Sequence, residues 1–153
     1  MGITLEFLIG NDEKIIEASK ELDIDIFDEA GCIIKRADFS LHITPNDLNT
    51  LSFVAAKLNK QKAISLRDNL DLLIDEPDHG LFKVNHSWVK YFAMVEADKL
   101  ESLAKEWYAE MQKQYANEII EVTIDGIQAV KDLSRICDLS INSGKNVFHF
   151  WYL

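Results

Sequence analysis

Residues 75–80 combine the two side-chain types that most often perform acid–base or metal chemistry. The segment reads Asp75-Glu76-Pro77-Asp78-His79-Gly80, and His86 follows shortly after it. Carboxylates beside an imidazole are suitable ligands for a divalent metal, and they also suit a general base that an acid orients. However, adjacent residues on one loop seldom converge on one point, and Pro77 and Gly80 are also ordinary turn residues. The segment therefore has two possible interpretations: a metal or acid–base site, or a solvated acidic loop.

The other histidines offer a second kind of chemistry. His42 and His149 both lie in segments that we expect to be strands, where they could meet each other and Cys32 or Ser40. A Cys/His or Ser/His pair would be a nucleophile with its base. Nothing in the spacing selects such a pair, and a half-buried histidine with a backbone hydrogen bond is the alternative.

Common catalytic and metal-binding signatures are missing from this chain. The acidic run from Asp23 to Glu29 has Phe27 where an EF-hand loop needs its third acidic ligand. Ser102 and Lys105 spell Ser-x-x-Lys, but the companion motifs of that chemistry are missing. Glycine-rich nucleotide loops, the Gly-x-Ser-x-Gly elbow and His-Glu-x-x-His are also missing. We therefore assign no catalytic residue, no metal ligand and no cofactor from the sequence.

Negative charge is the most uneven property of the sequence. The formal net charge is −10, and nine acids between Glu6 and Glu29 are opposed only by Lys14 and Lys20. A second acidic run, residues 68–78, contains no base. Such a surface repels phosphate backbones and attracts a basic protein or a cation, although solubility is the commoner use of surface acid. The carboxylates that we expect to bind a partner are Glu13, Glu17, Glu21, Asp25, Asp28, Glu29, Asp75, Glu76 and Asp78.

Aromatic residues offer a different binding surface. They are Trp88, Tyr91, Phe92, Trp107 and Tyr108. At helical spacing most of them belong in a core, but any that is exposed would resemble an interface hot spot. We include Trp88 among the expected partner-binding residues. A homodimer through the region of Trp88 and Trp107 is a further hypothesis.

Local sequence signals predict the elements of the N-terminal half. Strands are expected at residues 3–9 and 32–43, and residues 23–27 alternate between polar and apolar. Asn11 or Asp12 begins a helix, and Thr44-Pro45-Asn46-Asp47 begins another with Thr44 as its N-cap. A further helix is expected at residues 66–74, just before Pro77.

The C-terminal half is predicted in the same way. Residues 81–95 suit either a short helix that Ser87 caps or a strand, and we favour the helix. Asp98 and Glu101 form a capping-box pair for a helix that reaches Tyr115. A strand is expected at residues 118–125, then a helix that Asp125 caps and that ends near Gly144. Residues 147–153 are apolar on both faces, as in a strand of a sheet that is covered on both sides.

The whole chain, residues 1–153, is expected to form a single α+β domain. About five helices would pack on a small mixed β-sheet that includes the C-terminal strand. The length and the 48% hydrophobic composition are sufficient for one core. Cys32 and Cys137 lie far apart among apolar neighbours, so we expect reduced core cysteines. No signal peptide or membrane span is recognisable, so a cytoplasmic location is expected.

The order of elements resembles that of a known group of proteins. The resemblance lies in the Met1-Gly2 start into an apolar strand, the Val84–Val89 segment, the Leu100-x-x-Leu103-x-x-x-Trp107 helix and the apolar closing strand. Together they resemble small uncharacterised bacterial proteins, broadly YfbM-like. The resemblance implies a bacterial, stand-alone α+β domain and adds no site residue.

These observations lead to two hypotheses about function. The first is a non-enzymatic binding domain, immunity-like or regulatory, whose acidic face recognises a basic protein partner and neither nucleic acid nor a membrane. The alternative is a metal-dependent or small-molecule enzyme that uses the Asp75–His79 loop and His86.

Overall fold

The strand formed by residues 147–152 lies at the centre of the β-sheet. The computed structural model describes residues 2–40 and 43–153, and within them five strands follow the order β2-β1-β5-β4-β3. Every neighbouring pair is antiparallel, so the sheet is not mixed as the sequence suggested. The strands are β1 (Thr4–Gly10), β2 (Ile33–Asp38), β3 (Leu70–Asp75), β4 (His79–Val84) and β5 (Val147–Tyr152). The expected single α+β domain with the C-terminal strand in its sheet is confirmed.

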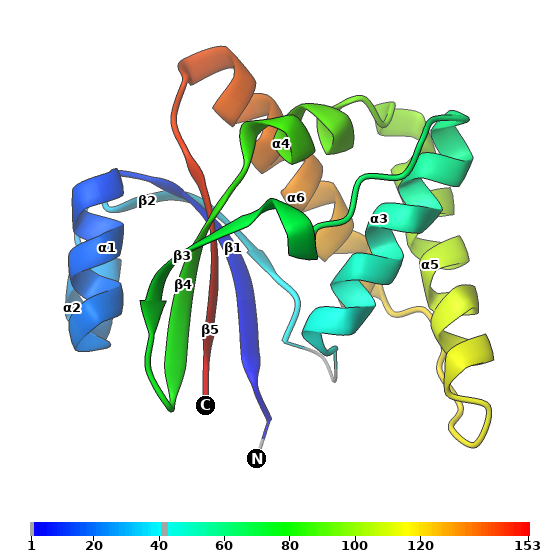
Figure 1. Ribbon diagram of the computed structural model, residues 1–153, viewed down its shortest axis with the longest axis horizontal. Coiled ribbons are helices and arrows are strands. Elements are labelled where there is room, and N and C mark those ends of the chain that lie inside the picture. The colour runs from blue at the N-terminus through cyan, green and yellow to red at the C-terminus, as the bar shows by residue number, and fades with distance from the viewer. Residues whose placement is uncertain (1, 41–42) are drawn as a thin grey trace.

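One face of the sheet carries the larger hydrophobic core. Leu5, Phe7 and Ile9 of β1 point to this face and pack against buried side chains of four helices. Figure 1 shows these helices on the right of the sheet. They are α3 (Pro45–Asn59), α4 (His86–Ala93), α5 (Leu100–Gln114) and α6 (Ile124–Ser143).

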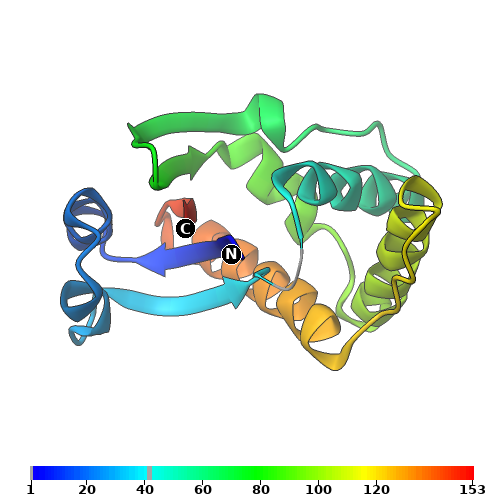
Figure 2. The same ribbon diagram turned by 90° about the horizontal axis from the view of Figure 1, so that it is seen from below.

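The opposite face carries a smaller core under two helices. Leu8, Phe148 and Phe150 point to this face and pack with Ile15 and Phe27. The helices are α1 (Asp12–Glu21) and α2 (Ile24–Asp28), which lie on the left of the sheet in both Figure 1 and Figure 2. Because helices cover both faces, β5 is apolar on both of its sides, as predicted.

Side-chain caps decide where several helices begin. Asn11 caps α1, and Thr44 and Asp47 form the predicted capping box of α3 with Pro45 in the first turn. The predicted Asp98–Glu101 box is wrong, because a 3₁₀ turn (Ala97–Lys99) leads directly into α5. Helix α6 is capped by Thr123, not Asp125, and ends at Gly144 as expected.

Three other segments differ from their predicted structure. Residues 66–74 form a 3₁₀ turn (Arg67–Asn69) followed by strand β3, because this segment pairs with β4. Residues 81–95 contain both alternatives, the end of β4 and then α4, which Asn85 caps in place of Ser87. Residues 24–28 are the short helix α2, which Asp23 caps.

Residues 119–123 form a loop, so the strand predicted at 118–125 is absent from this described stretch. The expected strand at 32–43 is the shorter β2, and Leu41 and His42 lie outside the described residues.

Candidate functional site

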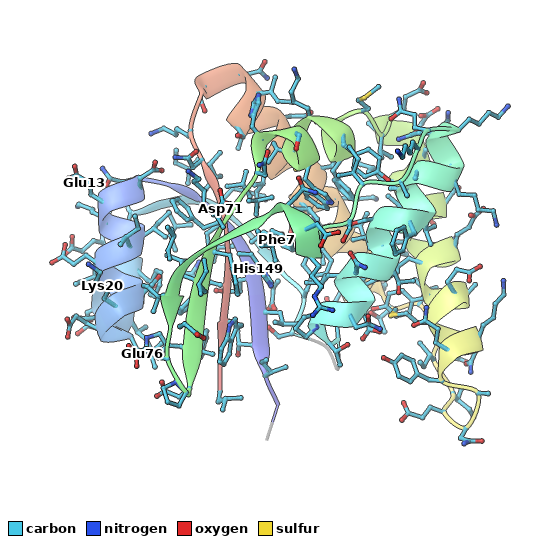
Figure 3. The ribbon with its side chains drawn as sticks, viewed as in Figure 1. Phe7, Glu13, Lys20, Asp71, Glu76 and His149 are labelled. Atoms are coloured by element: carbon cyan, nitrogen blue, oxygen red, sulfur yellow. The ribbon has the colours of Figure 1, made fainter. Side chains whose placement is uncertain are left out.

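The two acidic segments of the sequence lie at the same end of the molecule. Ile15 and Phe27 of the α1–α2 pair share one buried cluster with Ile74 of β3 and Leu81 of β4. The β3–β4 turn therefore lies beside the helices, and Figure 3 shows Glu13 of α1 and Glu76 of the turn on the same side. We define the acidic surface as Glu13, Glu17, Glu21, Asp25, Asp28, Glu29, Asp75, Glu76 and Asp78, all of which are exposed.

Nearby bases neutralise only part of the acidic surface. Lys14 Nζ lies 3.1 Å from Glu29 Oε2, and an Arg36 guanidinium nitrogen lies 3.9 Å from Asp28 Oδ1. Arg36 also lies 3.6 Å from a carboxylate oxygen of Glu6, where burial raises the pKa of Glu6 and Arg36 opposes that shift. Within the described residues, six carboxylates of the acidic surface form no ion pair: Glu13, Glu17, Glu21, Asp25, Asp75 and Glu76.

Trp88 does not belong to this surface. Its side chain is fully buried, its indole N–H donates to Ser52 Oγ at 3.0 Å, and its ring stacks on Phe92 at 5.1 Å. Trp107 is also fully buried. The prediction that Trp88 contacts a partner is therefore wrong, and neither indole is accessible to a second copy of the chain. The reason is helical spacing: α4 turns Trp88 and Phe92 toward the sheet together. The homodimer hypothesis itself stays a prediction.

The residues of the alternative enzyme hypothesis do not converge. His79 Nδ1 lies 2.7 Å from Asp78 Oδ1, but His79 is buried while Asp75 and Asp78 are exposed. His86 lies beyond the other end of β4, about 20 Å away at about 3.3 Å per strand residue. Within the described residues, no three His, Cys, Asp or Glu side chains form a group that could hold a metal ion.

The sheet separates Cys32 from His149, so these two residues do not form the nucleophile–base pair that the sequence allowed. Cys32 belongs to the cluster under α1 and α2, whereas His149 points to the opposite face beside Phe7. Ser40 instead binds Asp38 and the Leu5 amide. Both cysteines are free and buried, as expected for core residues. His42 lies outside the described residues.

His149 is a buried histidine with a backbone hydrogen bond. Its Nδ1 lies 3.1 Å from the Glu6 carbonyl oxygen, which can only accept, so Nδ1 carries the proton. Its ring stacks on Phe7 at 4.7 Å and is 2% exposed. Burial lowers the pKa of His149 to about 4, so the imidazole is neutral near neutral pH and Nε2 is an acceptor.

A cavity beside His149 was not anticipated from the sequence. Its volume is about 600 Å³, and it lies between the first turns of α3, residues 66–70 and the sheet. Its floor is Phe82, His149 and Trp151, and Leu48, Leu66 and Arg67 are among the residues of its walls. These residues come from four separate stretches of the chain, so no local spacing could have identified the cavity.

Comparisons with known proteins found no matching family model, no matching curated protein and no matching solved structure. The resemblance to YfbM-like proteins therefore stays a prediction. Within the described residues, no helix combines the length and the apolar character needed to cross a membrane.

Proposed function

We propose that this protein is a non-enzymatic binding domain whose acidic surface recognises a basic protein partner. An immunity-like protein that masks a cationic surface, or a regulatory protein, would act in this way. The observation that carries the proposal is the packing of α1 and α2 against β3 and β4. It brings two acidic segments, about fifty residues apart in the sequence, onto one end of the molecule.

The charge on this surface is available to a partner. The unpaired carboxylates of α1 recur along one helix at Glu13, Glu17 and Glu21, so their fields add along one side of it. A basic partner would gain attraction over the whole length of the helix, and its association would be fast and sensitive to salt. Nucleic acid is disfavoured because its phosphates would meet the same charge.

An apolar contact lies within the same surface. Ile24, at the start of α2, is 65% exposed between Glu21 and Asp25. Protein interfaces combine a small apolar centre with a polar rim, and the rim contributes mainly to association rate and selectivity. Ile24 is therefore expected to be the apolar anchor of this interface, with the carboxylates around it.

The test is a comparison of two charge-reversal variants with the same net charge. The first replaces Glu17, Glu21 and Glu76 by lysine, which reverses charge in both acidic segments. The matched control replaces Glu106, Glu118 and Glu121 by lysine; these exposed residues of α5 and the following loop form no described ion pair. Both variants and the wild type are used as baits, and bound proteins from the source cell are quantified at low and high salt.

The proposal expects a basic protein that binds the wild type and the control. It expects binding to the first variant to be at least about tenfold weaker and binding to the wild type to fall with salt. Equal loss with both variants would indicate a non-specific charge effect and would overturn the proposal. Binding that is unchanged in the first variant would overturn it as well.

A further inference from the structure

We propose that the cavity lined by Phe82, His149 and Trp151 binds a planar aromatic acid that carries a ring N–H or O–H group. This cavity lies on the α3 side of the sheet, whereas the acidic surface lies around α1 and α2. The inference is independent of the proposed basic partner, because it rests on different residues and on the opposite face.

The size and floor of the cavity suit a flat aromatic ligand. Its volume of about 600 Å³ is within the usual range of small-molecule sites. Phe82 and His149 are stacked neighbours on adjacent strands, with ring centroids 6.2 Å apart. Trp151 completes the floor and lies over Gly80, where a Cβ atom would be only 2.3 Å from its Nε1. The missing side chain at Gly80 therefore allows the indole to lie close to β4.

His149 determines which polar group the ligand must supply. Its Nδ1 proton is already donated to the Glu6 carbonyl, and this is the only hydrogen bond that the His149 ring forms with the described residues. Nε2 is not among the fully enclosed polar atoms that lack a partner, as expected for an atom that faces the cavity. The ring is 98% buried yet lines the cavity, so its only accessible partner is a molecule inside it. A neutral imidazole in this tautomer accepts at Nε2, so a ligand in the cavity that carries a donor can form a hydrogen bond there. The ligand is therefore expected to donate an N–H or O–H group to Nε2.

Arg67 determines the charge of the ligand. It lies in the cavity wall, is exposed and forms no described ion pair. Asp47 of α3 is not among the residues that line the cavity, and its carboxylate accepts hydrogen bonds from the Thr44 amide and the Tyr115 hydroxyl. The first turn of the fifteen-residue helix α3 also lines the cavity, and helix N-termini favour anions. An acidic substituent on the aromatic ring would therefore be held near Arg67.

Indole-3-acetate is a suitable probe because it combines a planar ring, a ring N–H group and a carboxylate. Two analogues isolate the polar contacts: 1-methylindole-3-acetate lacks the N–H, and 3-methylindole lacks the carboxylate. Binding is measured by calorimetry on the full chain. The His149 Cε1–H resonance and its shift on titration are recorded by NMR in the same samples.

Three variants test the assignments. His149→Phe keeps an aromatic floor without Nε2, and Arg67→Gln removes the cation. Arg135→Gln is the matched control, since Arg135 is an exposed arginine of α6 away from the cavity. Near-UV circular dichroism shows whether each variant keeps its fold, and His149→Leu, which also lacks an acceptor, replaces His149→Phe if the latter does not fold.

We expect saturable single-site binding of indole-3-acetate to the wild type and to Arg135→Gln, with a shift of the His149 resonance. Binding of 1-methylindole-3-acetate to the wild type should be about tenfold weaker than binding of indole-3-acetate, and His149→Phe should weaken binding of indole-3-acetate by a similar factor. His149→Phe should not weaken binding of 1-methylindole-3-acetate further, because both changes remove the same hydrogen bond. Arg67→Gln should weaken binding of the acid about tenfold but not of 3-methylindole. Failure of indole-3-acetate to saturate at millimolar concentration, equal binding of all three probes, or equal effects of the two arginine variants would overturn the proposal.

Discussion

Mild acid is expected to destabilise the protein through His149. The imidazole is buried between Phe7 and Phe82, and its Nδ1 donates to the Glu6 carbonyl. Protonation would place a positive charge in an apolar part of the core, whereas in the unfolded chain the charged ring is hydrated. The folded state therefore disfavours the proton, and burial lowers the pKa of His149 from 6.5 to about 4.

The size of the effect follows from this difference in pKa. Below pH 6.5 the unfolded state binds a proton that the folded state does not, so stability falls as the pH falls toward 4. The full loss is about 3.4 kcal/mol, at about 1.36 kcal/mol for each pKa unit. Between about pH 7 and about pH 5, roughly 2 kcal/mol of this is lost. Glu6 acts in the opposite direction, because burial raises its pKa and acid therefore favours the folded state through this carboxyl group.

The measurement is urea unfolding at about pH 7 and about pH 5 for the wild type and for His149→Gln. The glutamine amide can still donate to the Glu6 carbonyl but does not titrate. Because the Glu6 contribution is present in both proteins, it cancels when their pH dependences are subtracted. The wild type should lose about 2 kcal/mol more than the variant over this interval. Equal losses in the two proteins, or an NMR titration of His149 with a pKa near 6.5, would show that burial of His149 does not cause the loss of stability in acid.

Three further predictions concern packing and capping. Thr44→Ala removes the N-cap of α3 and should lower the free energy of unfolding by about 1 kcal/mol in urea titrations; an unchanged value would show that the cap contributes nothing. Tyr115→Phe removes the hydroxyl that donates to Asp47 Oδ1 at 2.9 Å and should lower the free energy of unfolding by about 1 kcal/mol. Thermal unfolding measures this change, and a gain in stability would contradict the prediction. Gly80→Ala would force the Trp151 indole to move and should cost about 1–3 kcal/mol with a shifted tryptophan emission; an unshifted spectrum would argue against their contact.

The parts of the fold that were predicted correctly depend on local chemistry. The start of α3 is specified by neighbouring residues, since the Thr44 hydroxyl and the Asp47 carboxylate exchange hydrogen bonds with each other's backbone. The C-terminal strand was recognisable because its apolar side chains fall on both faces, and helices do cover both faces of β5. The nine carboxylates of the acidic surface were also named from the sequence, and all of them are exposed.

The parts that were missed depend on distant partners. Leu66, Leu70, Leu73 and Ile74 have helical spacing, yet β3 forms because β4 is available to pair with it. Leu73 is 42% exposed at the edge of the sheet, so it is not part of a buried helical stripe. Sequence spacing also could not show that two acidic segments meet, because that outcome depends on how helices pack across the sheet. The burial of Trp88, by contrast, agrees with the helical spacing of Trp88 and Phe92 in α4.

The central position of β5 also determines when the sheet can form during folding. Strand β1 ends at Gly10, yet its partner on one side begins only at Val147. Until that partner arrives, the chain can form only two separate ribbons, β1 with β2 and β3 with β4, and isolated two-stranded ribbons are marginally stable in water. Pairing between strands so far apart in the sequence has an entropic cost of loop closure. We therefore expect this protein to fold more slowly than a helical protein of similar length whose contacts are mostly local. A nascent chain must therefore release residues 147–152 from the ribosome before its two halves can join, and until then β1 exposes an edge that a chaperone could bind.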